Sequence, residues 1–198
     1  MQIIDCDQNS PEWFEARKAT MTASNAQAIG NCGKGLDTYI INLMAEYYST
    51  GQKEQYENED LLRGHELEQL ASDVYELERG VTCKKTGFIK IDDYTGCSPD
   101  RLVGEEGLLE IKAPNDTTYF KILLNGEDEI DTKYIWQTQM QMLITGRKWC
   151  DLMFYNPNFK TSYKIFRILP DKEKFNALNK GLEIGRKKIQ EIKQKINE

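Results

Sequence analysis

The spacing of apolar residues changes once along the chain, from a helical period to a strand-like period. Over residues 61–78 apolar side chains recur every three to four positions and Gly80 follows as a stop signal; the predicted stripe is Leu67, Leu70, Ala71, Val74 and Leu77. After residue 87 the short apolar segments have a period of two, which is typical of strands. We therefore expect an α/β fold with a central mixed β-sheet of about five strands flanked by helices. The predicted helices cover 10–18, 37–49, 61–78, 133–145 and 171–198, and the predicted strands cover 87–91, 96–103, 108–113, 150–155 and 162–169.

The chain of 198 residues has the length of one ordinary domain, and its five prolines mark no linker. We expect residues 1–198 to form a single unit, with the polar segment 49–60 as a surface loop. The last helix, about 171–196, carries apolar residues at alternating three- and four-residue spacings. Its first half is expected to pack on the sheet. Its lysine-rich second half can instead contact a partner subunit or DNA.

Composition narrows the possible chemistry. Charged residues make up 29% of the chain and the hydrophobic set 39%, as in a soluble folded protein. Acidic residues outnumber basic ones by 32 to 26, so nonspecific binding of nucleic acid through net charge is disfavoured. The single histidine, His65, excludes a zinc site built from several histidines and leaves one residue for any histidine-based triad. Catalysis would therefore depend on carboxylates, lysine or cysteine.

The five cysteines are widely spaced and form no CxxC pair. This pattern favours reduced thiols in the cytoplasm over a disulfide framework, a zinc ribbon or an iron–sulfur cluster. The first residues lack the basic and apolar regions of a signal peptide, and the apolar runs are too short to span a membrane. We expect no membrane association.

Strands 96–103 and 108–113 carry the most informative polar residues. In the second strand Glu110 and Lys112 share one face, because alternate residues of a strand point the same way. A turn at 104–107 would bring Asp100 back beside Glu110. Two adjacent carboxylates repel each other, and a divalent cation that prefers oxygen ligands, Mg²⁺ or Mn²⁺, relieves the repulsion.

This arrangement predicts phosphodiester hydrolysis. A cation held by Asp100 and Glu110 can bind a scissile phosphate and activate a water molecule. Lys112 can orient that water and neutralise charge on the phosphate, and the Ile111 carbonyl could serve as a further ligand. The alternative is a surface hairpin with an ordinary Glu110–Lys112 ion pair, and the spacing alone does not decide between the two.

Further candidates lie outside this hairpin. Glu68 borders the apolar stripe of its helix, so it is either a third carboxylate for a second metal or a solvated glutamate. Gln137 and Gln141 are four residues apart on one helix face, where they could hold a water or a phosphate oxygen or simply form a polar surface. Arg17 and Ser24 near helix starts are suited to a terminal phosphate, although this signal alone is weak.

Taken together, these segments resemble the phage lambda exonuclease family, also called YqaJ-like viral recombinases, within the PD-(D/E)xK nuclease superfamily. The resemblance covers most of the chain in one order, and it is specific because the Ser-Pro-Asp and Glu-Ile-Lys-Ala-Pro cores are both intact. The matching segments are Trp13–Arg17 with Thr22–Ser24, Arg63–Glu68, Cys97–Leu102, Gly107–Pro114, Tyr134–Gln141 and Phe154–Pro157.

The resemblance implies a restriction-endonuclease-like core and a role for each matching residue. Asp100 and Glu110 would be shared metal ligands, with Glu68 on a second metal and the Ile111 carbonyl as a backbone ligand. Lys112 would be the catalytic lysine, and Gln137 would lie near the nucleophilic water. The residues implied to bind the 5′-phosphate of a DNA end are Arg17, Ser24 and Ser98. One departure is Thr118, where the lambda member has a further arginine for this phosphate; whether Lys121 substitutes is open.

The implied activity is a Mg²⁺-dependent 5′→3′ exonuclease on linear double-stranded DNA, with two ions and with Mn²⁺ as a substitute. It would leave 3′ single-stranded tails for recombination by a strand-annealing protein. The resemblance further suggests a ring-shaped homotrimer encoded by a phage or prophage and located in the bacterial cytoplasm. Two alternatives remain: a related endonuclease or structure-specific repair nuclease, and a non-catalytic DNA-binding subunit.

Overall fold

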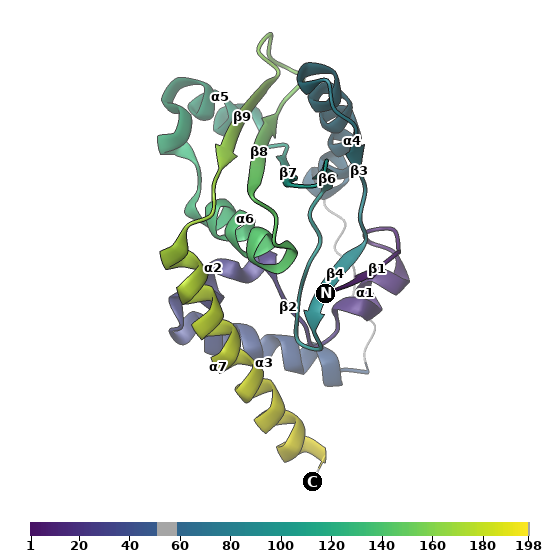
Figure 1. Ribbon diagram of the computed structural model, residues 1–198, viewed down its shortest axis with the longest axis vertical. Coiled ribbons are helices and arrows are strands. Elements are labelled where there is room, and N and C mark those ends of the chain that lie inside the picture. Colours follow the sequence, from purple (N-terminus) through teal and green to yellow (C-terminus); the bar gives the residue numbers. More distant parts are fainter. Residues whose placement is uncertain (51–58, 198) are drawn as a thin grey trace.

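The computed structural model describes residues 1–50 and 59–197, with the backbone alone for 59–63, 65 and 197 (Figure 1). Most of the predicted 49–60 loop and the side chain of His65 therefore lie outside the described residues. Within the described part of the chain, no helix combines the length and apolar character needed to cross a bilayer.

The larger of two sheets has five strands in the order β3-β6-β7-β8-β9. Its β7–β8 pair is parallel and its other pairs are antiparallel, which confirms the expected mixed sheet of about five strands. Its strands are β3 (Cys83–Lys84), β6 (Arg101–Val103), β7 (Gly107–Lys112), β8 (Trp149–Tyr155) and β9 (Tyr163–Ile168). The smaller sheet has the order β1-β4-β5-β2. Its strands are β1 (Gln2–Ile4), β4 (Phe88–Asp92), β5 (Thr95–Cys97) and β2 (Met21–Thr22).

Helices surround both sheets (Figure 1). They are α1 (Pro11–Arg17), α2 (Ala26–Asn31), α3 (Lys34–Tyr48), α4 (Glu59–Arg79), α5 (Asp116–Asn125), α6 (Thr132–Thr145) and α7 (Lys172–Asn197), with 3-10 turns η1 (Ala23–Asn25) and η2 (Gly126–Glu129). Ser10 caps α1 by accepting a hydrogen bond from the Trp13 amide, as its sequence signal predicts. The sequence pattern did not predict α5, a short helix that buries only Tyr119 and Ile122 and is capped by Asn115.

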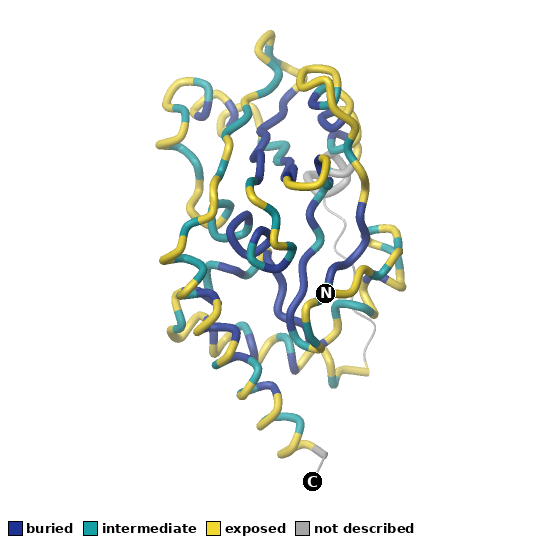
Figure 2. The backbone as a smooth tube through the Cα atoms, in the orientation of Figure 1, coloured by how far each residue is buried: buried dark blue, intermediate teal, exposed yellow. Residues whose placement is uncertain are grey.

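Strand β7 lies in the middle of the larger sheet and is covered on both faces. Leu109 and Ile111 pack in one cluster with Ala71 of α4, whereas Leu108 packs in another with Met142 of α6. Figure 2 shows buried residues concentrated along these central strands. Because Glu110 shares the face of Leu108, it points toward α6, and that helix becomes one wall of the site.

The predicted strand 96–103 is wrong in one respect. The structure divides it into β5 and β6, which belong to different sheets, and the Ser98-Pro99-Asp100 segment separates them. Proline has no amide hydrogen, so Pro99 cannot continue a ladder of hydrogen bonds. The chain therefore crosses between the two sheets at the residues expected to carry the chemistry.

The predicted apolar stripe of α4 is only partly correct. Leu67 and Ala71 are buried, but Leu70 is 51% exposed and Leu77 is 87% exposed. Tyr75 is buried in their place, and its hydroxyl donates to the buried Asp151 carboxylate at 2.7 Å. The buried residues of α4 therefore recur every four positions, at 67, 71 and 75. These positions are buried because they pack against Leu109 and Ile111 of the adjacent strand β7.

Helix α7 packs on other helices more than on the sheet that was expected to receive it. Leu178 and Leu182 are buried in the same cluster as Ile29 of α2 and Ile40 of α3. A Cβ atom at Gly181 would lie 1.9 Å from the Ile29 carbonyl oxygen, so the backbones of α2 and α7 are in direct contact. Figure 1 shows α7 running along α2 and α3 and continuing beyond them toward the C-terminus.

Candidate active site

The hairpin of β6 and β7 places Asp100 next to Glu110, as its turn predicts. Arg101 pairs with Leu109 across the ladder, so the residues flanking this pair, Asp100 and Glu110, are neighbours. The Ile111 amide donates a hydrogen bond to Asp100 Oδ2 at 2.6 Å. This bond fixes the Asp100 carboxylate against the backbone of β7.

Glu110 is 2% exposed, and three side-chain donors converge on its carboxylate. Its Oε1 accepts from Lys112 Nζ at 2.6 Å and from Gln137 Nε2 at 2.5 Å. Its Oε2 accepts from Gln141 Nε2 at 2.7 Å. The alternative of an ordinary surface ion pair between Glu110 and Lys112 is therefore wrong, because the Glu110 carboxylate is buried and accepts hydrogen bonds from three side chains.

The charges of this cluster are strongly coupled. Burial raises the pKa of the Asp100 carboxyl well above its ordinary value, and the nearby Glu110 raises it further against the opposing effect of Lys112. Burial alone would lower the pKa of Lys112, but the Glu110 and Asp100 carboxylates outweigh burial and raise it. Lys112 thus stays an ammonium group, and two carboxylates share this one cation.

A cavity of about 220 Å³ joins this cluster to the predicted phosphate-binding residues. Of the predicted residues it is lined by Arg17, Ser24, Ser98, Asp100, Glu110, Lys112 and Gln137. Gln141, the second glutamine of the predicted helix face, also lines it. So do four residues to which the sequence assigned no role, namely Gln8, Trp13, Thr22 and Ala23. Segments far apart in the sequence thus surround one space.

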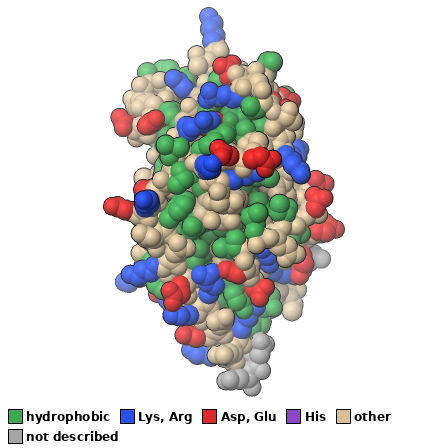
Figure 3. All heavy atoms as spheres, viewed as in Figure 1, with side chains coloured by type: hydrophobic (Ala, Val, Ile, Leu, Met, Phe, Trp, Pro, Cys, Tyr) green, Lys and Arg blue, Asp and Glu red, His purple; other side chains and the backbone are tan. Residues whose placement is uncertain are grey.

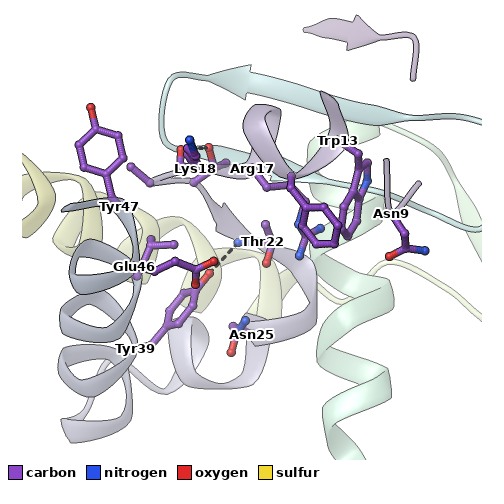
Figure 4. Close-up of a pocket in the computed structure, with 13 residues that line it drawn as sticks. Asn9, Trp13, Arg17, Lys18, Thr22, Asn25, Tyr39, Glu46 and Tyr47 are labelled. Carbon is purple, nitrogen blue, oxygen red and sulfur yellow. Dashed lines mark hydrogen bonds between the residues drawn. The ribbon is translucent and has the colours of Figure 1, made fainter. Parts of the chain in front are cut away.

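Arg17 lies between this cavity and a second one of about 370 Å³. Figure 4 shows Arg17 and Trp13 of α1 on one side of the second cavity and Tyr39 of α3 on the other. The Arg17 guanidinium lies 3.9 Å from the centre of the Trp13 ring, and the Trp13 indole donates to Ser98 Oγ at 2.8 Å. In the described part of the chain, no hydrogen bond or ion pair engages this half-buried guanidinium. It is available for an anion.

Glu68 lies outside the 220 Å³ cavity. It lines a neighbouring cavity of about 340 Å³, which Asp100 and Arg101 also line. Its Oε1 accepts from Arg101 Nη1 at 2.6 Å. Among the described residues, no three Asp, Glu, His or Cys side chains gather around one point. The structure brings Asp100 together with Glu110 on one side and with Glu68 on the other, and does not gather all three.

The residues present fit a divalent cation that prefers oxygen. Asp100 and Glu110 supply two carboxylates, and Ile111, the residue after Glu110, supplies a backbone carbonyl oxygen; all three are hard ligands of the kind Mg²⁺ and Mn²⁺ prefer. The mutual repulsion that raises the pKa of Asp100 is the repulsion that a bound cation would relieve.

For Gln141 the sequence left two interpretations open, a side chain that holds a water or a phosphate oxygen and a polar surface. Its side chain is fully buried and its Nε2 is fixed by Glu110. Its Oε1 is a buried acceptor with no hydrogen-bond partner among the described residues. The signal for it was its four-residue spacing from Gln137. By contrast, Thr118 and Lys121 are exposed on α5 and are not among the residues that line the cavity.

Comparison with known sequence families gives a match over residues 12–148 to the YqaJ-like viral recombinase domain. The chain belongs to the YqaJ-like viral recombinase family. This confirms the resemblance seen in the sequence. No curated protein sequence matches the chain.

Solved structures support the family membership. The alkaline exonuclease LHK-Exo from Laribacter hongkongensis is 31% identical, with a TM-score of 0.81 over 95% of this chain and 98% of that one. A structure of LHK-Exo in complex with dAMP matches with the same values. A phage-related exonuclease from Haemophilus somnus 129PT is 14% identical, with a TM-score of 0.65 over 89% of this chain and 96% of that one, and bears on the fold alone. This YqaJ-like chain has the PD-(D/E)xK fold and is a nuclease of the lambda exonuclease type, as predicted.

Proposed function

We propose that the chain is a Mg²⁺-dependent exonuclease that degrades linear double-stranded DNA in the 5′→3′ direction and leaves 3′ tails. The observation that carries this proposal is the shared cavity, in which Arg17, for which the described residues provide no ion-pair partner, and the Asp100–Glu110–Lys112 cluster face one space. If Arg17 binds the 5′-phosphate at the end of a DNA strand, the first phosphodiester bond of that strand lies at the Asp100–Glu110–Lys112 cluster.

Each side chain has a distinct part in this proposal. Arg17, with the hydroxyls of Ser24 and Ser98, binds the 5′-phosphate by charge-assisted hydrogen bonds. Lys112 neutralises charge that develops on the scissile phosphate, and Gln137 orients the attacking water. A divalent cation bound by Asp100, Glu110 and the Ile111 carbonyl would polarise that phosphate. We propose a second ion beside Glu68, with Mn²⁺ able to replace Mg²⁺.

The biological setting is also a proposal. The family description names a viral recombinase, which supports a role in recombination, with the 3′ tails passed to a single-strand annealing protein. LHK-Exo is described in complex with dAMP, which supports release of mononucleotides by this chain as well. We propose a ring-shaped homotrimer acting in the cytoplasm of a phage-infected bacterium, and light scattering at micromolar concentration tests the trimer.

The first experiment tests the reaction itself. Linear and circular duplex DNA are incubated with the protein, with and without Mg²⁺. Linear duplex should be degraded only with Mg²⁺, and Asp100→Ala and Lys112→Ala should abolish degradation. Cutting of circular duplex would identify an endonuclease instead. No cutting of either substrate would favour the non-catalytic DNA-binding subunit.

The second experiment tests the phosphate site with labelled duplexes that end in a 5′-phosphate or a 5′-hydroxyl. The phosphorylated end should be degraded faster, and Arg17→Ala should reduce this preference by roughly 10- to 100-fold, the loss expected for one hydrogen bond to a charged group. Lys18→Ala is the matched control, because Lys18 is the adjacent cation, is exposed and pairs with Glu15. Equal rates on both ends for the parent protein would contradict the site.

A further inference from the structure

Arg101 is a buried cation directly beside the candidate metal ligands. It is 3% exposed and follows Asp100 in the chain. Its Nη1 donates to Glu68 Oε1 at 2.6 Å and to the Asp100 carbonyl at 2.7 Å. Its other nitrogens donate to Ser72 Oγ at 3.0 Å and to Gln69 Oε1 at 3.2 Å. Three of these four hydrogen bonds reach α4, so one guanidinium ties β6 to that helix.

The two sides of Asp100 consequently differ in charge. On the Glu110 side the cation is Lys112, whose side chain is 21% exposed and flexible, so it can move when another cation arrives. On the Glu68 side the cation is Arg101, whose side chain is 4% exposed and held by four bonds. A guanidinium does not lose its proton in a protein, so the Glu68 side keeps this positive charge at any working pH.

The two sides also differ in the ligands they offer. The Glu110 side has two carboxylates and the Ile111 carbonyl, and the donors on Glu110 are one ammonium and two neutral amides. The Glu68 side has the Asp100 carboxylate, shared with the first position, and the Glu68 carboxylate, whose Oε1 already accepts from Arg101. Asp7 and Lys85 also line this cavity and add one charge of each sign. A cation there gains less attraction and meets a fixed positive charge nearby.

We propose that Arg101 acts as an internal counter-ion of Glu68 and makes the two metal positions unequal. The first ion binds at Asp100, Glu110 and the Ile111 carbonyl, and the position beside Glu68 binds its ion at least tenfold more weakly. Arg101 is thus a positioning residue that sets the order in which the metal positions fill. This inference rests on the proposed metal-dependent function.

Calorimetric titration of the full chain with Mn²⁺ in the absence of DNA tests the inference without any measurement of activity. The parent should bind one ion tightly and a second at least tenfold more weakly. Glu68→Gln should remove only the weak ion. Arg101→Gln, which keeps hydrogen-bonding capacity and removes the charge, should tighten the second ion at least fivefold and leave the first within about twofold.

Arg147→Gln is the matched control, because Arg147 lies between α6 and β8 and donates to the carbonyls of Gly104 and Gly107 at the turn of the β6–β7 hairpin, away from the metal ligands. It should leave both affinities unchanged. Circular dichroism confirms that each variant is folded. If Arg101→Gln does not fold, Glu68→Gln still tests the inference, because it should remove only the weakly bound ion. Two equal affinities in the parent, or a second ion weakened by Arg101→Gln, would overturn the inference while the metal-dependent function stands. Binding of no Mn²⁺ would overturn both.

Discussion

At the scale of single residues, the local hairpin made part of the site predictable. Asp100, Glu110 and Lys112 could be grouped from the sequence because a short turn and the strand period fix their relation. Gln141 and Arg101 could not, since their partners depend on how α6 and α4 dock on the sheet. Their contacts, with Glu110 and with Glu68, join residues about thirty positions apart in the chain.

Gln141→Met should lower kcat by about 10- to 100-fold, the range typical when a partner of a metal ligand is removed, and leave KM for DNA nearly unchanged. The reason is that Gln141 holds Glu110 Oε2 and faces no solvent. Steady-state kinetics on linear duplex measures both constants.

Gln139→Met is the control for that variant. Gln139 lies on the same helix and is 2% exposed, but it bonds the Leu169 carbonyl and the Asp171 amide, away from the cavity. Losing these two bonds should cost about 1–3 kcal/mol of stability and leave kcat unchanged. Equal kcat values for Gln141→Met and Gln139→Met would show that Gln141 does not contribute to catalysis.

At the scale of elements, the helices with clear caps and periods were well predicted, and errors arose where neighbours override the local pattern. The stripe on α4 was misjudged because Leu70 and Leu77 fit a helical period equally well but face solvent. The 96–103 strand was misjudged because its alternation continues through Pro99, while the ladder does not. The short strands β1, β2 and β3 have too few residues to show any period.

Gly181→Ala should destabilise the protein by about 1–3 kcal/mol, although alanine favours helices, because the added methyl group would meet the Ile29 carbonyl. Thermal melting should show a midpoint lower by roughly 2–4 °C for each kcal/mol. Gly35→Ala in α3 is the control, since its Cβ would lie 3.8 Å from that of Ala28, an ordinary contact. A Gly181→Ala midpoint at or above that of Gly35→Ala would contradict the close contact of α2 and α7.

At the scale of the whole molecule, the net charge of −6 is spread widely. Figure 3 shows acidic and basic side chains interspersed over one face, with no continuous basic surface. Nonspecific attraction to DNA is accordingly weak from this face, and in the proposed function the binding of an end would depend on the position of individual cations such as Arg17. The composition predicted this balance, but only the folded chain shows that Arg17 lines the same cavity as Asp100, Glu110 and Lys112.

Buried tyrosines should make the molecule less stable at high pH. Burial raises the pKa of Tyr119 to about 12, and its hydroxyl donates to the Thr161 carbonyl at 2.7 Å. The unfolded chain releases this proton near pH 10, so the stability from Tyr119 is complete below that pH and is lost as the pH rises through about 12. Tyr75 acts in the same direction, because burial and Asp151 raise its pKa.

Denaturant titrations at several values between pH 8 and about 11.5 should therefore show a smaller loss of stability for Tyr119→Phe than for the parent. Tyr47→Phe is the control, because Tyr47 is 39% exposed. Parallel curves for the parent and Tyr119→Phe would show that the Tyr119 hydroxyl does not contribute to the pH dependence.

The segment between β5 and β6 is short and firmly held. Pro99 is buried with a restricted backbone, and Gln8 Nε2 donates to both the Pro99 and Thr86 carbonyls at 3.1 Å. In the proposed reaction, Ser98 at one end holds the terminal phosphate and Asp100 at the other end directs cleavage. The distance between the proposed phosphate site and the proposed cleavage site would therefore be set by a rigid segment of three consecutive residues, Ser98 to Asp100.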